Sequence, residues 1–253
     1  MEFEDNSTIK SADSNWLITY MNLKENIIYF NLRPGEQINE STIANKFKIS
    51  RTPVRTALAK LVLDGLVTVY PQKGSFVSKI NLKLIREYLF TRSSLEYAVM
   101  QIAMVDFPED QLEKLEENLK LQKKALKQKN IHDILTLDSE MHKIIYEGCG
   151  YGNVWDSVKR MNTDVDRLRY LKLVSGLNIA SDSAIAAIMD WTTTLQDHFE
   201  YLKFIKKEKT KGLMKFVKVH VEVLLEDARI LSTLYPDYFI FEETDNEKTM
   251  FYR

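Results

Sequence analysis

The strongest constraint on the fold lies in residues 32–77, where signals for a turn, helices and strands follow closely on one another. Arg33-Pro34-Gly35 predicts a turn, because proline fixes φ and glycine accepts the conformations that follow it. Asn39 is placed to cap a short helix. Its apolar positions, which have helical spacing, are Ile43, Ala44 and Phe47. The segment is therefore expected to open with a turn and a short helix.

A second helix is expected directly afterwards. Ser50 is a good N-cap residue, and Pro53 falls in the first turn, where a missing N–H costs little. One face is apolar, with Val54, Leu58, Leu61 and Val62, while the basic residues Arg51, Arg55 and Lys60 lie off that face. Gly65 stands where a helix C-cap is expected. This second helix is expected to bury one side and to expose cationic side chains.

Two strands are expected to follow the second helix. Residues 66–69 and 75–78 are rich in strand-forming side chains, and the basic turn 71–74 separates them. The segment thus combines turn, helix, turn, helix and hairpin.

This order resembles the winged helix-turn-helix domain of the GntR family of bacterial transcription regulators, over roughly residues 17–79. The most specific matches are LRPGEQINE, SRTPVRTAL and DGLVTVYPQKGSFV, and three such signals in the correct order make chance agreement improbable. Thr56 departs from the family pattern, which usually has an acidic residue after the second arginine of the recognition helix. The resemblance implies binding to double-stranded DNA.

Each part of this domain implies a kind of DNA contact. The helix from Arg51 is expected to enter the major groove, where arginine discriminates guanine edges. Hydroxyls and amides at the helix start suit phosphate, and the wing tip suits the backbone or the minor groove. The residues predicted to contact DNA are Arg33, Ser50, Arg51, Thr52, Arg55, Lys73 and Gly74. A homodimer would read an inverted-repeat operator, because its two-fold symmetry imposes one.

The distribution of charge supports this interpretation. The whole chain has 253 residues and a net charge of -1, yet residues 16–80 contain nine Lys or Arg and only four acidic residues. A basic segment on a nearly neutral chain is expected where only that segment meets phosphates. The single cysteine, Cys149, excludes an intrachain disulfide. The sequence contains no apolar run long enough to predict a membrane span. A cytoplasmic protein is therefore expected.

The pattern becomes helical after residue 80. We expect four parts: an acidic tail at 1–15, the winged helix-turn-helix domain at 16–80, a helical domain at 81–240 and a C-terminal tail at 241–253. The first domain should open with a helix at 16–30. The helices expected in the second are 81–105, 109–129, 131–147, 153–175, 182–207 and 210–233, with start signals at Pro108 and Ser181-Asp182. The fold class is thus mainly α, an N-terminal winged helix-turn-helix domain followed by an all-α antiparallel bundle.

The helical domain contains the four histidines of the chain. Asp138 and His142 stand at i and i+4, so both emerge from one helix face. His198 and His220 are 22 residues apart around a polar midpoint at Lys209. A helical hairpin turning there would bring both to the same height, each about 16 Å from the turn. Three imidazoles and a carboxylate can then converge, a set that suits zinc, nickel or another divalent first-row metal.

The helical half also resembles the FCD domain, the ligand-binding domain of the FadR subgroup of GntR regulators, over about residues 82–239. The markers are Arg92-x-x-Leu95-Glu96, Asp138-x-x-x-His142, Asp197-His198, His220 and the sequence YPDYF at 235–239. The resemblance implies a metal held by the aspartate and three histidines, with a small organic acid completing its coordination. The implied metal ligands are Asp138, His142, His198 and His220. His132 has no counterpart and is expected at a surface or a helix start.

Arginines of this domain are candidates for the effector site. Arg92 can clamp a ligand carboxylate in bidentate fashion, or it can form an ion pair with Glu96. Arg169 and Arg167 lie on a helix that can line the same cavity, although a solvated face is equally compatible with the pattern. The tryptophans Trp155 and Trp191 are expected in the core.

The function expected from these patterns is a homodimeric, metabolite-responsive repressor. Two other classes fit parts of the sequence. An Asp/His centre with open coordination positions can serve a metal-dependent hydrolase, but no nucleophile motif such as G-x-S-x-G accompanies it. The helices could instead belong to an assembly protein whose winged domain binds another protein.

Overall fold

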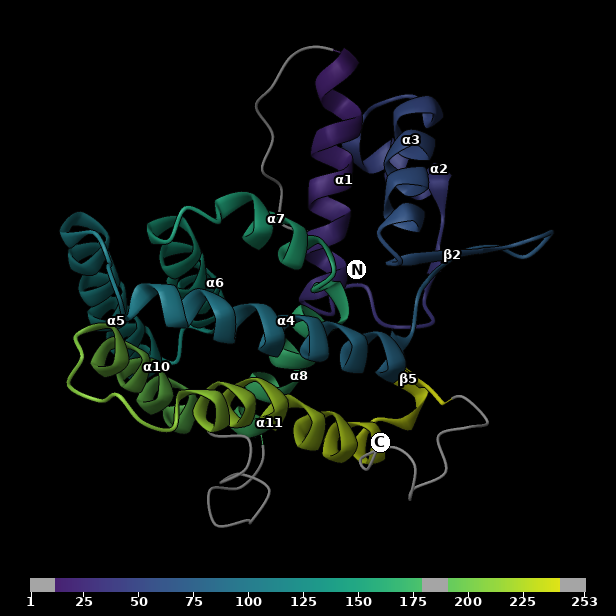
Figure 1. Ribbon diagram of the computed structural model, residues 1–253. Coiled ribbons are helices and arrows are strands. Elements are labelled where there is room, and N and C mark those ends of the chain that lie inside the picture. The colour runs from purple at the N-terminus through teal and green to yellow at the C-terminus, as the bar shows by residue number, and fades with distance from the viewer. Residues whose placement is uncertain (1–11, 179–190, 242–253) are drawn as a thin grey trace. The chain divides into compact units, whose positions relative to one another are not determined.

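The computed structural model describes residues 12–178 and 191–241. They form two compact units, one from the described parts of 1–82, 163–167 and 232–253 and the other from those of 83–162 and 168–231. Helices dominate throughout (Figure 1), which confirms the mainly α fold class. Residues 1–11 of the tail expected at 1–15, the helix start expected at Ser181-Asp182 and residues 242–253 of the expected C-terminal tail lie outside the described residues.

Three helices and a small sheet build the first unit. The helices are α1 (Ala12–Ile28), α2 (Glu40–Phe47) and α3 (Arg51–Leu63), so the first begins four residues before the expected start at 16. Their apolar faces meet in one core, whose fully buried members include Leu23, Ile27, Leu32, Val54, Leu61 and Leu66. The core fixes α3 against α1 and α2 and leaves the opposite side of α3 exposed.

The N-terminal ends of α2 and α3 are built differently. Asn39 Oδ1 accepts hydrogen bonds from the backbone N–H groups of Ser41 and Thr42, at 2.9 and 3.1 Å. This side-chain cap was predicted. Ser50 occupies the N-cap position of α3, but its side chain makes no capping hydrogen bond. The predicted N-cap position of Ser50 is confirmed, but the helix start keeps backbone N–H groups that its hydroxyl does not satisfy.

A three-stranded antiparallel sheet forms the wing. It contains β1 (Gln37–Ile38), β2 (Val67–Tyr70) and β3 (Gly74–Val77) in the order β1-β3-β2, with Val67 opposite Val77 and Tyr70 opposite Gly74. Its two long strands lie within one residue of the predicted 66–69 and 75–78. The two-residue strand β1 is too short to show the alternating pattern of a strand, and it was not predicted.

A second, parallel pair of strands completes the first unit. Strand β4 (Ile80–Asn81) pairs with β5 (Phe239–Ile240), which follows the short 3-10 helix η1 (Pro236–Tyr238). Ile80 and Phe239 are buried. The segment that follows the wing is thereby paired with residues near the far end of the described chain.

The second unit consists of helices. They are α4 (Leu82–Ala103), α5 (Glu109–Gln128), α6 (Ile131–Gly148), α7 (Gly152–Arg160), α8 (Thr163–Asn178), α10 (Thr192–Ile205) and α11 (Leu213–Leu234), of which α4, α8 and α11 extend into the first unit. The single helix expected at 153–175 is wrong, because α7 and α8 are separated at Met161 and Asn162. Asn162 is buried, and asparagine competes with the helical backbone for hydrogen bonds.

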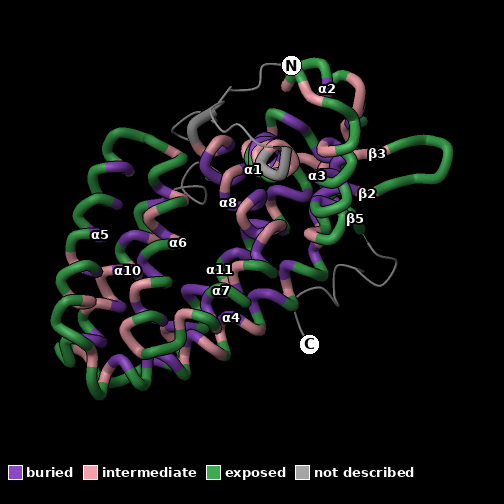
Figure 2. Tube along the Cα trace, turned by 90° about the horizontal axis from the view of Figure 1, so that it is seen from above, coloured by how far each residue is buried: buried purple, intermediate pink, exposed green. Residues whose placement is uncertain are grey.

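Burial follows the helical period in this unit. Helix α5 packs against α6 and α10, and its buried positions face these neighbours while its outer side is exposed (Figure 2). Two of its buried positions, Asn118 and Gln122, are polar. Polar groups in such a core need hydrogen-bond partners, so Asn118 and Gln122 indicate that other polar side chains are buried next to α5.

The two caps give a paired stability prediction. Asn39→Ala should lower the free energy of unfolding of the first unit by about 1 kcal/mol, because two backbone N–H groups lose their acceptor. Ser50→Ala should change it by less than about 0.5 kcal/mol. Urea unfolding followed by circular dichroism measures both. Equal losses in the two variants would contradict the assignment of the caps.

Candidate metal centre and nucleic-acid interface

Helix α3 presents two arginines on its solvent side. Val54, Leu58 and Leu61 are buried and hold the helix against the core, whereas Arg51 and Arg55 are exposed. Arg55 Nε donates to Glu40 Oε2 at 2.9 Å, with 66% of the arginine side chain exposed. An exposed ion pair of this kind contributes little stability, so the guanidinium is readily released to another acceptor.

The remaining predicted DNA contacts also lie on exposed positions of the first unit. They are Arg33, Ser50, Thr52, Lys73 and Gly74. Gly74 has φ +104°, and a Cβ there would lie 3.2 Å from Gln37 Nε2, so the tight turn at the wing tip favours glycine. Gln37 also donates to the Lys73 carbonyl at 3.0 Å, which ties β1 to the wing tip. The wing therefore has a defined, exposed end.

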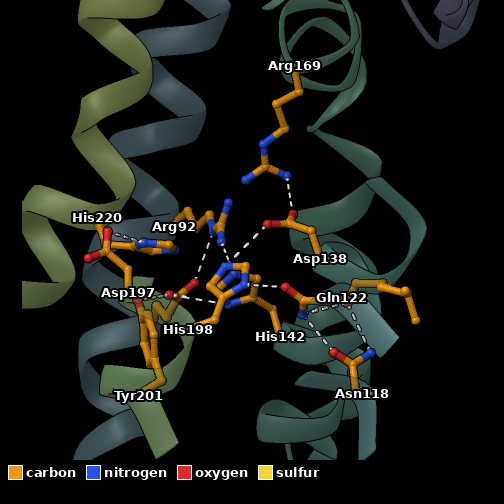
Figure 3. A network of polar contacts seen from close by, with 12 residues as sticks. Arg92, Asn118, Gln122, Asp138, His142, Arg169, Asp197, His198, Tyr201 and His220 are labelled. Carbon is orange, nitrogen blue, oxygen red and sulfur yellow. Dashed lines mark hydrogen bonds and ion pairs between the residues drawn. The ribbon is translucent and has the colours of Figure 1, made fainter. Parts of the chain in front are cut away.

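Three of the four histidines converge inside the second unit. His142 comes from α6, His198 from α10 and His220 from α11, and one nitrogen of each lies within 4.8 Å of the others. Figure 3 shows these three side chains close to one another, and all three are buried. The structure thus brings together the histidines that the sequence selected, while His132 has 59% of its side chain exposed next to the start of α6.

A chain of hydrogen bonds fixes the proton of His198. Asn118 Nδ2 donates to the Leu137 carbonyl, so its Oδ1 is the acceptor for Gln122 Nε2 at 2.7 Å. Gln122 therefore presents Oε1 to His198 Nδ1, 2.7 Å away. Because Oε1 can only accept, Nδ1 bears the hydrogen and Nε2 of the neutral ring is left with its lone pair.

The free lone pair of His198 faces a carboxylate. His198 Nε2 lies 3.4 Å from Asp138 Oδ1, and both atoms are buried without a hydrogen-bond partner. The other oxygen, Asp138 Oδ2, accepts from Arg169 Nη1 at 2.8 Å. Two buried acceptors that face each other without a proton between them are unfavourable unless a cation or a hydrogen-bond donor binds both. Asp138 and His198 thus fit a metal ion.

The other two histidines have partners outside the cluster. His220 Nδ1 donates to Asp197 Oδ2 at 3.0 Å, a carboxylate–histidine contact that leaves Nε2 as the possible ligand atom. His142 Nε2 lies 2.6 Å from Arg92 Nη2, and since arginine can only donate, Nε2 must accept. A metal bound at that nitrogen would take the place of the Arg92 contact.

Arg92 and Arg169 both lie at the cluster, as predicted. Arg92 is 1% exposed and its Nε donates to Glu96 Oε2 at 3.0 Å, so the ion pair foreseen as an alternative is formed as well. The other Glu96 oxygen accepts a short hydrogen bond from Tyr201. Arg167 is not at the cluster. Its guanidinium lies in the first unit.

Burial and charge set the protonation of the cluster. Burial lowers the pKa of His142 and of His198, and the positive Arg92 lowers that of His142 further. Burial alone would raise the pKa of Asp138, but the charge of Arg169 overcomes it and holds that pKa well below its ordinary value. The centre therefore combines neutral imidazoles with an ionised carboxylate, which is the donor set of a divalent first-row metal.

Several residues around the cluster were not singled out from the sequence. Gln122 and Asn118 are the buried polar positions of an otherwise amphipathic α5, four residues apart, and that spacing is the one signal the sequence carried. Lys172 and Asp227 form a second buried pair at 2.9 Å. The expected core positions of Trp155 and Trp191 are confirmed, since both are 4% exposed.

Family comparisons agree with the two units. Residues 19–77 match the gntR family of bacterial regulatory proteins, and residues 87–223 match the FCD domain. The chain therefore belongs to the GntR regulators that carry an FCD domain, and it is a DNA-binding transcriptional regulator rather than an enzyme.

Relatives match most of this chain, and a solved structure shares its fold. The HTH-type transcriptional repressor RspR of Escherichia coli (strain K12) is 28% identical over 220 residues, 87% of this chain and 91% of that protein. The HTH-type transcriptional regulator YdhC of Bacillus subtilis (strain 168) is 24% identical over 206 residues, 81% and 87% of the two chains. A GntR regulator structure from Rhodococcus sp. RHA1 shares the fold, with a TM-score of 0.64, 22% identity and coverage of 87% and 98%.

None of the described helices combines the length and the apolar character needed to cross a bilayer.

The buried neutral histidines predict a loss of stability in acid. Because the pKa of His142 and of His198 is lower in the folded than in the unfolded state, the unfolded chain binds more protons below its ordinary histidine pKa. In chelator, the free energy of unfolding should fall below about pH 6.5 by up to about 1.4 kcal/mol per pH unit for each histidine. Urea titrations followed by tryptophan fluorescence at several pH values measure this slope.

A matched pair of variants assigns the slope. His198→Gln should make it shallower, while His132→Gln, at an exposed position, should leave it unchanged. An identical slope in His198→Gln and the wild type would show that His198 is not the titrating group.

Proposed function

We propose that this chain is a metabolite-responsive repressor of the FadR subgroup that binds an inverted-repeat operator as a homodimer. A divalent metal and a small organic acid in the helical domain would set its DNA affinity. The observation that carries the proposal is the pair of buried acceptors, Asp138 Oδ1 and His198 Nε2, facing each other at 3.4 Å among three clustered histidines.

The DNA part of the proposal rests on α3 and the wing. Arg51 and Arg55 are exposed near the start of α3 and are suited to guanine edges in the major groove. The uncapped N–H groups at Ser50 and the hydroxyl of Thr52 suit a phosphate, as do Lys73 and Gly74 at the wing tip. Arg33 lies in an exposed turn of the same unit, where it can contact the backbone.

The metal part assigns four ligands. Asp138, His142, His198 and His220 would hold the ion, and zinc or nickel suits three imidazoles and one carboxylate. Gln122 and Asp197 would orient two of the rings from outside. When bound, the ion would supply a fixed positive charge for an anionic ligand. Metal binding is also a known property of FCD domains.

Arg92 and Arg169 would recognise the organic acid. Arg92 Nη2 lies 2.6 Å from His142 Nε2. A metal bound to that nitrogen would displace the guanidinium, whose Nη2 could then donate to a carboxylate. Arg169 holds the opposite side of the centre through Asp138. A carboxylate on the metal would then meet positive charge on two sides, a geometry that selects small anions over neutral metabolites.

The homodimer is supported by an apolar face of α4. Leu84, Phe90, Ile102 and, just beyond the helix end, Val105 are exposed, with Phe90 and Val105 at 73% and 75%. Apolar side chains gathered along one helix mark a protein interface more often than a solvated surface. The repressor assignment is supported by the similar protein RspR, which is named as a transcriptional repressor.

Arg55 gives a test of base reading. Arg55→Ala should weaken binding to a duplex selected from a random pool by the wild-type protein by about 5- to 150-fold, the range of one bidentate base contact. Binding to a scrambled duplex should weaken by less than about 3-fold, because phosphate contacts remain. Fluorescence anisotropy at fixed salt measures both affinities.

Arg229 supplies the matched control for this experiment. It lies in the second unit, is paired with Glu226, and loses the same charge on Arg229→Ala. Binding of the two duplexes should stay within about 2-fold of the wild type. An equal loss on both duplexes in Arg55→Ala would remove Arg55 from the base-reading role.

The metal assignment is tested with zinc. The double variant Asp138→Ala/His198→Ala should lose tight zinc binding, and Gln122→Leu should weaken it about 10- to 100-fold because His198 loses the acceptor that orients it. Competition against a chromophoric chelator measures the affinity. His132→Ala, which removes an exposed histidine, should bind as the wild type does. Unchanged zinc affinity in the double variant would contradict the site.

A further inference from the structure

The segment between the wing and α4 is held by the first turn of α8. Arg167 Nη2 donates to the Ser78 carbonyl at 2.5 Å, just after β3. The Asn81 N–H, directly before α4, donates to Asp164 Oδ2 at 3.0 Å. Arg167 Nη1 joins the two contacts by donating to Asp164 Oδ1 at 3.0 Å. All four residues belong to the first unit, and the two side chains bind backbone atoms at both ends of the segment 78–81.

The burial of this ion pair carries a desolvation penalty that apolar side chains at the same core position would not have. Arg167 is fully buried, and its Nε has no hydrogen-bond partner among the described residues. A buried ion pair of this kind is often no more stabilising than apolar side chains of similar size. The pair instead constrains geometry, because two backbone groups must lie at fixed positions for the hydrogen bonds to form. The pair therefore specifies the conformation of segment 78–81.

The same helix reaches the candidate metal centre. Arg169 follows Arg167 by two residues and donates to Asp138 Oδ2 at 2.8 Å within the second unit. Side chains two residues apart on a helix emerge about 200° from one another. Helix α8 therefore carries one arginine bound to the segment after the wing and another, on its opposite side, bound to a candidate metal ligand.

We propose that Asp164 and Arg167 are positioning residues that transmit the state of the Asp138–histidine centre, through α8, to segment 78–81 of the DNA-binding unit. The inference rests on the proposed function of that centre. A cation at Asp138 Oδ1 competes with Arg169 for the charge of this carboxylate. Any resulting shift of Arg169 moves a helix whose first turn is bonded to the segment. Packed helices move as rigid bodies, so the shift alters both backbone hydrogen bonds together.

Hydrogen exchange at the Asn81 amide tests the proposal without knowledge of the operator. In the full-length wild type, zinc should change the exchange rate of this amide, and it should change the affinity for the selected duplex by about 5-fold or more. In Asp164→Asn/Arg167→Met, which leaves no unpaired charge, both zinc effects should fall below about 2-fold. Zinc affinity should stay within about 3-fold of the wild type, because Arg169 and Asp138 are retained. Arg167→Lys, which can still donate to the Ser78 carbonyl, should restore part of both effects.

Arg160 provides the matched control. It is exposed on α7 and donates to Ser157, so Arg160→Met removes the same charge without touching segment 78–81. Its zinc effects should equal those of the wild type. If the wild type binds zinc and the duplex, but zinc changes neither observable or the double variant keeps both changes, the inference is overturned. If the wild type binds no zinc, the proposed metal centre fails, and the inference fails with it.

Discussion

The helical unit depends on one electrostatic constraint, the burial of hydrogen-bond acceptors that nothing in the described residues satisfies. The amides of Asn118 and Gln122 direct the proton of His198 away from Asp138, so a lone pair and a carboxylate oxygen are left 3.4 Å apart. A single proton between them would relieve the conflict, but burial lowers the pKa of His198 and Arg169 holds that of Asp138 down. A divalent ion, as proposed for this centre, would satisfy both atoms without a change in protonation.

The two arginines at this centre differ in the groups to which they donate hydrogen bonds. Arg169 is committed to Asp138 Oδ2, while Arg92 is shared between Glu96 and His142. Of these contacts, the one between Arg92 and a neutral imidazole is the weakest electrostatically, because only one partner is charged. Metal at His142 would therefore displace Arg92 before Arg169. In the proposed function, this order would link occupancy by metal to recognition of an anion.

The sequence predicts the clustering of these side chains well, because their spacing is a local property. Asp138 and His142 share a helix face at i and i+4, and a hairpin around Lys209 brings His198 level with His220. It could not predict the hydrogen-bond chain through Gln122, since the direction of that amide depends on the Leu137 carbonyl on a different helix. The break at Asn162 was missed for a related reason: asparagine competes only modestly with the helical backbone, and its burial at the break depends on the folded chain.

Arg167 and Arg169 show how far a local pattern can mislead. Both were grouped as possible lining of one cavity, yet a separation of two residues places them about 200° apart around α8, so a single cavity cannot accept both. The structure resolves the pair into two roles: Arg169 meets a carboxylate of the second unit, whereas Arg167 meets the Ser78 carbonyl and Asp164 of the first. A helix with charged groups buried on opposite sides cannot rotate freely, because rotation would break ion pairs on both sides at once. Motion along its axis or a tilt is the displacement left to it, and either would change the backbone contacts at Ser78 and Asn81 together.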